Sequence, residues 1–262
     1  ALPIWALAAR SDKVLLFLGL DEGSETEGYD REHMRLRENQ LDLLREIAEV
    51  NPNVGVVLQC GSPVEMTWDV FVRAVLHLYL GGQAVGSACA ALLTGEANPS
   101  GKLAETMPVR LEDTPCAPWY PGREATSEYR EGLFVGYRYY ESAHKRVKYP
   151  FGYGLSYTEF SYAPGEFSPG GVSFTVKNTG SRAGAEVAQL YVRSKTLGML
   201  RPALSLAGFA RVELLPGEEK TVFLPLGERS FAGWSFAKNR WVVGEGDYEP
   251  YGRSEKHRLE QN

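Results

Sequence analysis

The sequence has few of the residues that build a disulfide framework, a metal centre or a nucleic-acid interface. Its 262 residues include 3 cysteines and 4 histidines. Cys60, Cys89 and Cys116 are far apart and show no Cys-x-x-Cys spacing, and no two histidines have the spacing of a zinc site. The net charge of −5 gives no basic footprint for nucleic acid. We therefore expect no metal, no cofactor and no nucleic-acid partner.

Long apolar runs are also missing. No stretch reaches the roughly 18 to 20 apolar residues that cross a bilayer, so we expect no membrane partner. The chain opens with Ala1-Leu2-Pro3 and has no basic segment followed by an apolar one, so any signal peptide would lie outside this chain. With 44% hydrophobic and 23% charged residues, the chain can bury the core of one or two domains.

The first half of the chain has the pattern of alternating strands and helices. Residues 13–20 form an apolar run of the kind that is buried on both faces of a parallel sheet. Residues 38–47 carry apolar side chains at helical spacing, and residues 54–60 predict a second buried strand. Two strands joined by a helix form a βαβ unit, which is nearly always right-handed. Residues 4–10 and 84–93 predict two further helical segments.

An acidic loop connects the first predicted strand to its helix. Glycines at positions 19, 23 and 28 let its backbone turn sharply. Open α/β sheets bind ligands at the carboxyl ends of their strands, which is where this loop lies. On charge alone, a solvated surface loop is the competing interpretation. Five acids fall within ten residues: Asp21, Glu22, Glu25, Glu27 and Asp30.

The second half changes character from Phe160 onward. Short alternating apolar runs without intervening helices predict an antiparallel β-sandwich. The runs are residues 172–177, 186–193, 204–214, 220–226 and 241–243, with a last strand at 247–249. Before them come an aromatic cluster at 129–140 and a segment at 149–158 with glycines at alternate positions. We expect these two segments to pack against a neighbouring surface.

Five motifs occur in the order found in one enzyme family. They are Glu-Thr-Glu-Gly-Tyr-Asp-Arg at 25–31, followed by segments 61–68, 98–103, 131–140 and 150–158. Together they resemble glycoside hydrolase family 3, the β-glucosidase and β-xylosidase family. The block after Gly170 resembles the fibronectin type III-like domain that closes many members. One departure is Leu36-Arg37, which stands where the family commonly has Leu-Pro.

The resemblance implies a fold class and a domain order. We expect part of an open α/β sandwich, with a mostly parallel sheet and flanking helices, followed by a fibronectin type III-like β-sandwich. The predicted boundaries are 1–118, 119–158 and 159–262. In the family, an (α/β)₈ barrel carries the nucleophilic aspartate, so we expect that barrel in the same polypeptide or in a partner chain. Some members also carry an inserted PA14 domain, and this chain begins about where that insert would end.

The resemblance also assigns roles to the acidic loop. Retaining glycosidases need two carboxyl groups about 5 to 5.5 Å apart, one acting as nucleophile and the other as general acid and then base. Aligned on Glu-Gly-Tyr-Asp-Arg, the family's acid/base falls on Glu27. Glu25 stays open as the alternative acid/base, because alternate residues of an extended loop point opposite ways, or as a residue that tunes the charge and shape of the loop. We interpret Asp30 and Arg31 as a pair that shapes the loop, and Ser62 as a turn or helix-cap residue.

The leading hypothesis is the C-terminal portion of an exo-acting β-glycosidase that acts on a β-linked glycoside, with β-glucosidase first. β-Xylosidase and β-N-acetylglucosaminidase are alternatives within the same family. The non-enzymatic alternative is a carbohydrate-binding module, which would have no use for closely spaced acids on a strand-to-helix loop. A secreted or periplasmic location is favoured, although the sequence does not fix the compartment.

Overall fold

The computed structural model describes residues 3–122, 125–168, 170–194, 200–244 and 248–253. The chain forms two compact units, each built from separate stretches of sequence. The first consists of Ala1–Leu93, Met107–Glu128 and Arg146–Tyr149, and the second of Thr94–Thr106, Tyr129–Lys145 and Pro150–Asn262. The three-part division at 118/119 and 158/159 stays a prediction.

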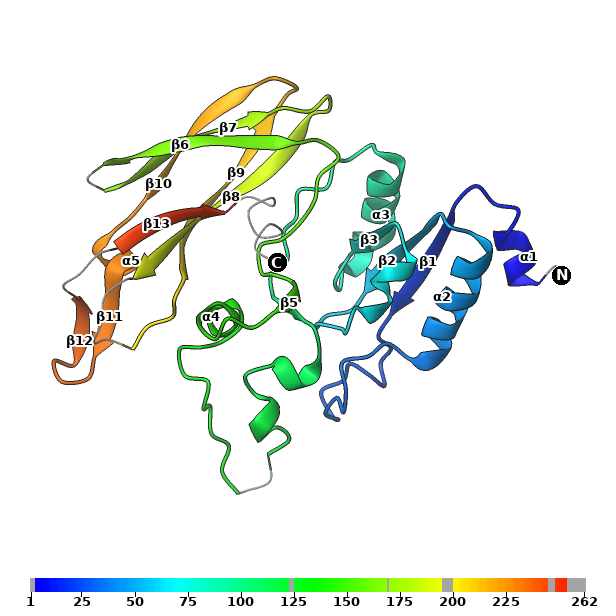
Figure 1. Ribbon diagram of the computed structural model, residues 1–262, viewed down its shortest axis with the longest axis horizontal. Coiled ribbons are helices and arrows are strands. Elements are labelled where there is room, and N and C mark those ends of the chain that lie inside the picture. Colours follow the sequence, from blue (N-terminus) through cyan, green and yellow to red (C-terminus); the bar gives the residue numbers. More distant parts are fainter. Residues whose placement is uncertain (1–2, 123–124, 169, 195–199, 245–247, 254–262) are drawn as a thin grey trace. The chain divides into compact units, whose positions relative to one another are not determined.

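The first unit is built on a three-stranded parallel sheet (Figure 1). Its strand order is β1 (Val14–Gly19), β2 (Val54–Gln59) and β3 (Ala74–His77). The predicted strands at 13–20 and 54–60 are therefore present and parallel. β3 continues the same direction beside β2, which brings the carboxyl ends of all three strands to one edge of the sheet.

Helix α2 (Glu38–Val50) connects β1 to β2 and lies along the sheet (Figure 1). Its buried side chains Leu41, Leu44 and Ile47 form one apolar stripe, as their spacing predicts. Asn51 ends the helix and is itself buried. Its amide group donates to the carbonyls of Ala8 and Ser11, at 2.8 and 2.7 Å, so this buried polar group is satisfied.

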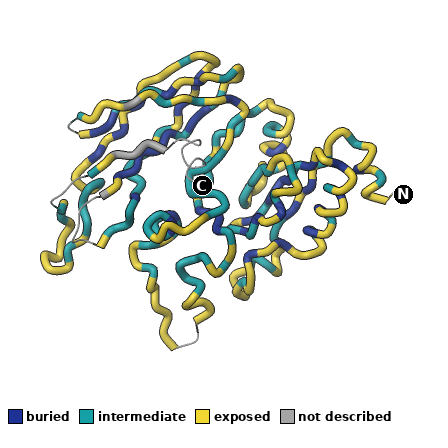
Figure 2. The backbone as a smooth tube through the Cα atoms, viewed as in Figure 1, coloured by how far each residue is buried: buried dark blue, intermediate teal, exposed yellow. Residues whose placement is uncertain are grey.

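The prediction that the first strand is buried on both faces is wrong for β1. Leu16 and Leu18 are 8% and 5% exposed, whereas Leu15 and Phe17 are 47% and 62% exposed. Successive side chains of a strand point to opposite faces of the sheet, so within the part of the chain that the structure describes one face of β1 is covered and the other is open. The central strand β2 does match the prediction, because Val56, Val57 and Leu58 are all nearly inaccessible to solvent (Figure 2).

Short elements complete the first unit. The predicted small-residue helix is α3 (Val85–Thr94), which buries Cys89. β4 (Met107–Pro108) pairs with β5 (Val147–Tyr149), and both strands belong to this unit. The remaining elements are α1 (Ile4–Ala8) and the 3₁₀ turns η1 (Thr67–Phe71), η2 (Gly82–Ala84), η3 (Leu111–Asp113) and η4 (Ala117–Trp119).

The second unit contains the predicted antiparallel sandwich. One sheet has the order β10-β7-β6 and the other β13-β8-β9, and the two form separate layers (Figure 1). Their core includes Val176 of β7, Leu190 of β8 and Leu214 of β9. The strands are β6 (Phe160–Ser168), β7 (Gly171–Asn178), β8 (Gly184–Ser194), β9 (Ser205–Leu214), β10 (Glu219–Pro225) and β13 (Tyr248–Arg253).

A helical turn and a two-stranded hairpin lie between β10 and β13. They are α5 (Glu228–Phe231), β11 (Ala232–Ser235) and β12 (Arg240–Val243). The predicted run at 241–243 lies in β12, where it pairs with β11. Of the predicted last strand, Tyr248 and Glu249 begin β13, whereas Asp247 lies outside the described residues.

Strand β8 is buried on both faces. Ala188, Leu190 and Val192 face the sandwich core, and Tyr191 packs against Tyr137, the first residue of α4 (Tyr137–Ser142). The Tyr137 ring also stacks on Phe151 with 4.8 Å between the ring centroids. The expected packing is therefore confirmed for Tyr137 and Phe151, whereas Tyr129 and Tyr157 of the same segments are 91% and 46% exposed.

Candidate active site

The candidate site lies at the carboxyl edge of the parallel sheet, on the loops that follow β1 and β2. Gln40, in the first turn of α2, fixes the end of β1. Its side chain accepts from the Gly19 N–H at 3.0 Å and donates to the Gly19 carbonyl at 2.9 Å. A Cβ at position 19 would clash with the Gln59 carbonyl oxygen, so this close approach requires glycine.

The loop after β1 begins with a turn closed by Asp21. The Asp21 side chain accepts from the backbone N–H and the hydroxyl of Ser24, at 3.0 and 2.8 Å. Arg37, which precedes α2, forms an ion pair with the same carboxylate at 2.6 Å. The pKa of Asp21 is lowered, first by the hydrogen bond from Ser24 and then by Arg37. Asp21 and Glu22 therefore begin a formed turn rather than an irregular acidic stretch.

Thr26 and Tyr29 pair through an antiparallel bridge. Glu27 and Gly28 consequently form the two-residue tip of a tight turn. Glu27 is exposed and makes no hydrogen bond or ion pair with any residue that the structure describes. Its carboxylate is available to a ligand.

Glu25 is held by the loop that follows β2. Both of its carboxylate oxygens accept from the Gly61 N–H, at 3.0 and 2.9 Å, and Oε1 also accepts from the Ser62 hydroxyl at 2.6 Å. Glu25 and Glu27 therefore differ sharply, because Glu25 is anchored to the neighbouring strand's loop, whereas Glu27 has no partner among the residues that the structure describes.

Asp30 and Arg31 do not pair with each other. Arg31 Nη1 donates to the Ser62 hydroxyl at 2.6 Å and to the Pro63 carbonyl at 3.2 Å. Asp30 accepts a hydrogen bond from the Tyr120 hydroxyl, and the pKa of Tyr120 is raised, first by burial and then by this bond. The direct ion pair predicted between the neighbours is absent, while each side chain reaches a more distant part of the same unit. Their role in shaping the loop stays a prediction.

His77 ends β3 close to this network. Burial lowers the pKa of its imidazole, and a hydrogen bond to the Leu58 carbonyl and the charge of Glu25 oppose this shift without cancelling it. Its ring lies 3.9 Å from that of Tyr79, centroid to centroid. Nε2 is buried without a hydrogen-bond partner among the described residues. No pattern in the chain pointed to this residue, because a single histidine at a strand end has no motif.

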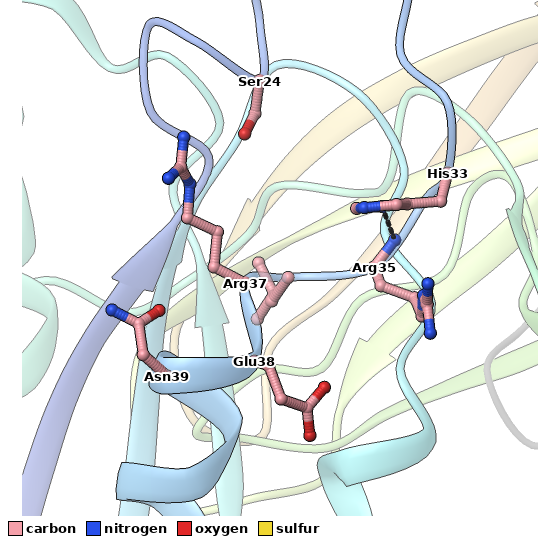
Figure 3. A pocket seen from close by; sticks show the side chains of 7 residues that line it. Ser24, His33, Arg35, Arg37, Glu38 and Asn39 are labelled. Atoms are coloured by element: carbon pink, nitrogen blue, oxygen red, sulfur yellow. Dashed lines mark hydrogen bonds between the residues drawn. The ribbon is translucent and has the colours of Figure 1, made fainter.

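A hollow of about 500 Å³ lies beside the loop, along the segment that leads into α2. In Figure 3 the Arg37 side chain extends toward Ser24, and the Arg35 backbone N–H donates to His33 Nδ1. Neither Glu25 nor Glu27 lines it, so it is not the site of the candidate acid/base. Its lining residues are Ser24, His33, Arg35, Leu36, Arg37, Glu38 and Asn39.

The described residues contain no group of three or more histidine, cysteine, aspartate or glutamate side chains able to hold a metal ion. Within the same part of the chain, no helix combines the length and the apolar character that a membrane span requires. The group that the loop presents is an exposed carboxylate, that of Glu27, on a turn anchored through Glu25.

Two family models match the chain. The glycosyl hydrolase family 3 C-terminal domain matches residues 4–157, and the fibronectin type III-like domain matches residues 186–251. Among curated proteins, thermostable beta-glucosidase B of Acetivibrio thermocellus is 47% identical over 92% of this chain. An exo-alpha-(1->6)-L-arabinopyranosidase of Bifidobacterium breve is 42% identical over 92% of it. The chain spans 33% of the length of each of these two relatives.

Solved structures of beta-glucosidases share the fold of this chain, at sequence identities close to those of the curated relatives. The beta-glucosidase of Bifidobacterium adolescentis superposes with a TM-score of 0.91 at 40% identity, covering 95% of this chain and 38% of that one. The Kluyveromyces marxianus beta-glucosidase in complex with glucose gives a TM-score of 0.91 at 37% identity, covering 97% of this chain and 31% of that one.

Proposed function

Because this chain belongs to glycoside hydrolase family 3, we propose that it supplies the general acid/base to the active site of a retaining, exo-acting β-glycosidase, with β-glucosidase as the leading activity. Glu27 is the proposed acid/base. Its carboxylic acid protonates the departing glycosidic oxygen, and the resulting carboxylate then activates the water that releases the sugar.

The contrast between Glu25 and Glu27 is the single observation that carries this assignment. A general acid must come within hydrogen-bond reach of the oxygen that it protonates. Glu25 is committed to Gly61 and Ser62, whereas Glu27 stands at the tip of the turn with no partner among the described residues. A solvated loop of no function would not need Glu25 fixed so firmly while Glu27 is left exposed.

The second carboxyl group is proposed to come from an (α/β)₈ barrel, in the same polypeptide or in a partner chain. Since the family resemblance assigns the nucleophile to that barrel, we expect purified residues 1–262 alone to hydrolyse no glycoside. An inserted PA14 domain and the boundaries 1–118, 119–158 and 159–262 stay predictions.

Two sugars are candidates for the terminal unit that the proposed glycosidase releases. Most of the named relatives are beta-glucosidases, which favours a terminal β-glucosyl unit. The Bifidobacterium breve relative is named for an arabinopyranosyl unit, and its 42% identity makes that sugar the second candidate. β-Xylosidase activity, β-N-acetylglucosaminidase activity and a non-catalytic carbohydrate-binding role rank behind these two sugars.

The test uses the full-length enzyme and substrates with different leaving groups. Glu27→Gln should slow glucosides with poor leaving groups about 10² to 10⁴ times more than activated aryl glucosides, which need little protonation. Added azide should restore the rate of Glu27→Ala and yield a β-glycosyl azide.

Glu25→Ala is the matched control, and azide should not restore its rate. Azide rescue of Glu25→Ala without rescue of Glu27→Ala would move the acid/base by two residues. No leaving-group dependence in either variant would refute the proposed function.

A further inference from the structure

We propose that Ser62 is a positioning residue for the acid/base, because its hydroxyl group fastens both ends of the turn that carries Glu27. This inference rests on the assignment of Glu27 made above. Ser62 itself makes no contact with Glu27 and takes no part in proton transfer.

The two hydrogen bonds of Ser62 have fixed directions. A carboxylate only accepts, so the hydroxyl proton goes to Glu25 Oε1 at 2.6 Å. A guanidinium only donates, so Arg31 Nη1 gives its proton to the Ser62 oxygen, also at 2.6 Å. One hydroxyl group can make both bonds at once, and each is strengthened by the charge of its partner.

Glu25 and Arg31 lie on either side of the Glu27 turn. Between them, the Thr26–Tyr29 bridge closes the turn itself. The Gly61 N–H on one side and the Pro63 carbonyl on the other add further bonds to the same anchors. The loop after β2 thus holds the turn at both ends, and Ser62 is the side chain shared by the two attachments.

Glu27 depends on these attachments because no other contact among the described residues holds it. A Cβ at the adjacent Gly28 would find no atom within 4 Å, so the tip of the turn stands in open space. The position of the Glu27 carboxylate is then set by the backbone of the turn. A misplacement of about 1 Å can reduce a catalysed rate about 10²-fold.

The experiment compares Ser62→Ala, Ser62→Thr and Ser24→Ala in the full-length enzyme. We expect Ser62→Ala to lower kcat/KM about 10- to 100-fold for glucosides with poor leaving groups, and less than about threefold for dinitrophenyl glucoside. Ser62→Thr keeps a hydroxyl group and should recover most of the rate. Ser24→Ala removes a hydroxyl group that bonds Asp21 in the same loop, and should stay within about twofold of the parent for both substrates.

A second arm places Ser62→Ala in the Glu27→Ala background. With the acid/base removed, Ser62→Ala should cause no further loss for any substrate. A loss that persists there, or one that is equal for all leaving groups and accompanied by a lower Tm, would overturn the positioning role of Ser62. The Glu27→Ala variant with azide tests the proposed function separately, since its result does not depend on Ser62.

Discussion

Glu25 and Glu27 are separated by one residue, yet only Glu25 is bonded to the neighbouring loop, through Gly61 and Ser62. Closely spaced acids on a flexible loop would repel one another and sample many positions. Here one carboxylate is used to fix the loop, which leaves the other exposed at a defined place. The two residues should therefore respond differently to substitution.

Replacement of Glu25 should lower activity least when the new side chain can still accept hydrogen bonds from Gly61 and Ser62. Glu25→Gln keeps one side-chain oxygen for Ser62 and Gly61, whereas Glu25→Ala removes every acceptor. In the full-length enzyme we expect Glu25→Ala to lower kcat about 10- to 100-fold and Glu25→Gln to lower it less. Steady-state kinetics of both variants check this. Equal losses would show that the charge of Glu25 matters rather than its anchoring.

Acid should destabilise the first unit through His77. Because burial lowers the pKa of this histidine below its ordinary value of 6.5, the unfolded chain binds the proton more readily. The contribution of neutral His77 to the free energy of unfolding is therefore fully present above pH 6.5 and decreases as the pH drops below 6.5. His77→Asn, which keeps a donor toward the Leu58 carbonyl, should show a smaller fall. Urea unfolding at pH 8 and pH 5.5 measures the loss of unfolding free energy in the parent protein and in His77→Asn. Equal losses in the two proteins would show that His77 does not cause this pH dependence.

The buried ion pair of the second unit should be sensitive to loss of one partner. Lys102 and Glu186 lie 3.1 Å apart with side chains 8% and 5% exposed. Lys102→Met leaves the Glu186 charge buried beside Tyr162 and should cost about 3 to 5 kcal/mol of unfolding free energy. The double variant with Glu186→Gln should be more stable than Lys102→Met.

The control for this pair is Lys177→Met. Lys177 and Glu219 form an ion pair with side chains 47% and 61% exposed, so its loss should cost less than about 1 kcal/mol. Chemical denaturation compares the variants. A similar loss of unfolding free energy in Lys102→Met and Lys177→Met would mean that burial does not set the strength of the Lys102–Glu186 pair.

Arg37→Pro should be tolerated better than Arg37→Ala. Arg37 has φ −63°, which is the angle of proline, and its N–H donates no hydrogen bond to the described residues. Both variants lose the ion pair with Asp21, but proline restricts the unfolded chain, an effect of about 0.4 to 1 kcal/mol. We expect Arg37→Pro to unfold at the higher Tm in differential scanning calorimetry. The reverse order would show that the backbone at this position cannot accept proline.

The βαβ unit could be predicted because its signals are local. The apolar run of β1 and the helical spacing in α2 each lie within one segment. β3 was not predicted, because Ala74–His77 is only four residues long and lies in a stretch whose apolar residues also fit a helix. The exposed face of β1 escaped prediction too, since burial of a face depends on what packs against it, which the sequence of a single strand does not record.

The position of the acidic loop was predictable, but its anchoring was not. Charge and adjacency suggested an Asp30–Arg31 pair, whereas Arg31 instead bonds Ser62, 31 residues away in the chain. Such a contact arises only when the sheet brings the ends of β1 and β2 together. A single sequence also gives no means of distinguishing a serine that caps a turn from one that joins two loops.

The open tip of the turn has a consequence for how the loop that carries Glu27 could change by mutation. Tyr29 is 81% exposed, and Gly28 has free space around it without needing a left-handed backbone. Since Glu25 and Arg31 hold the turn, larger or differently charged side chains at positions 28 and 29 would meet no other residue that the structure describes, and their effect would fall on the proposed barrel and substrate. If selection for altered acceptor molecules is made on the proposed full-length glycosidase, these two positions are where it should begin, with Glu25, Arg31 and Ser62 left unchanged.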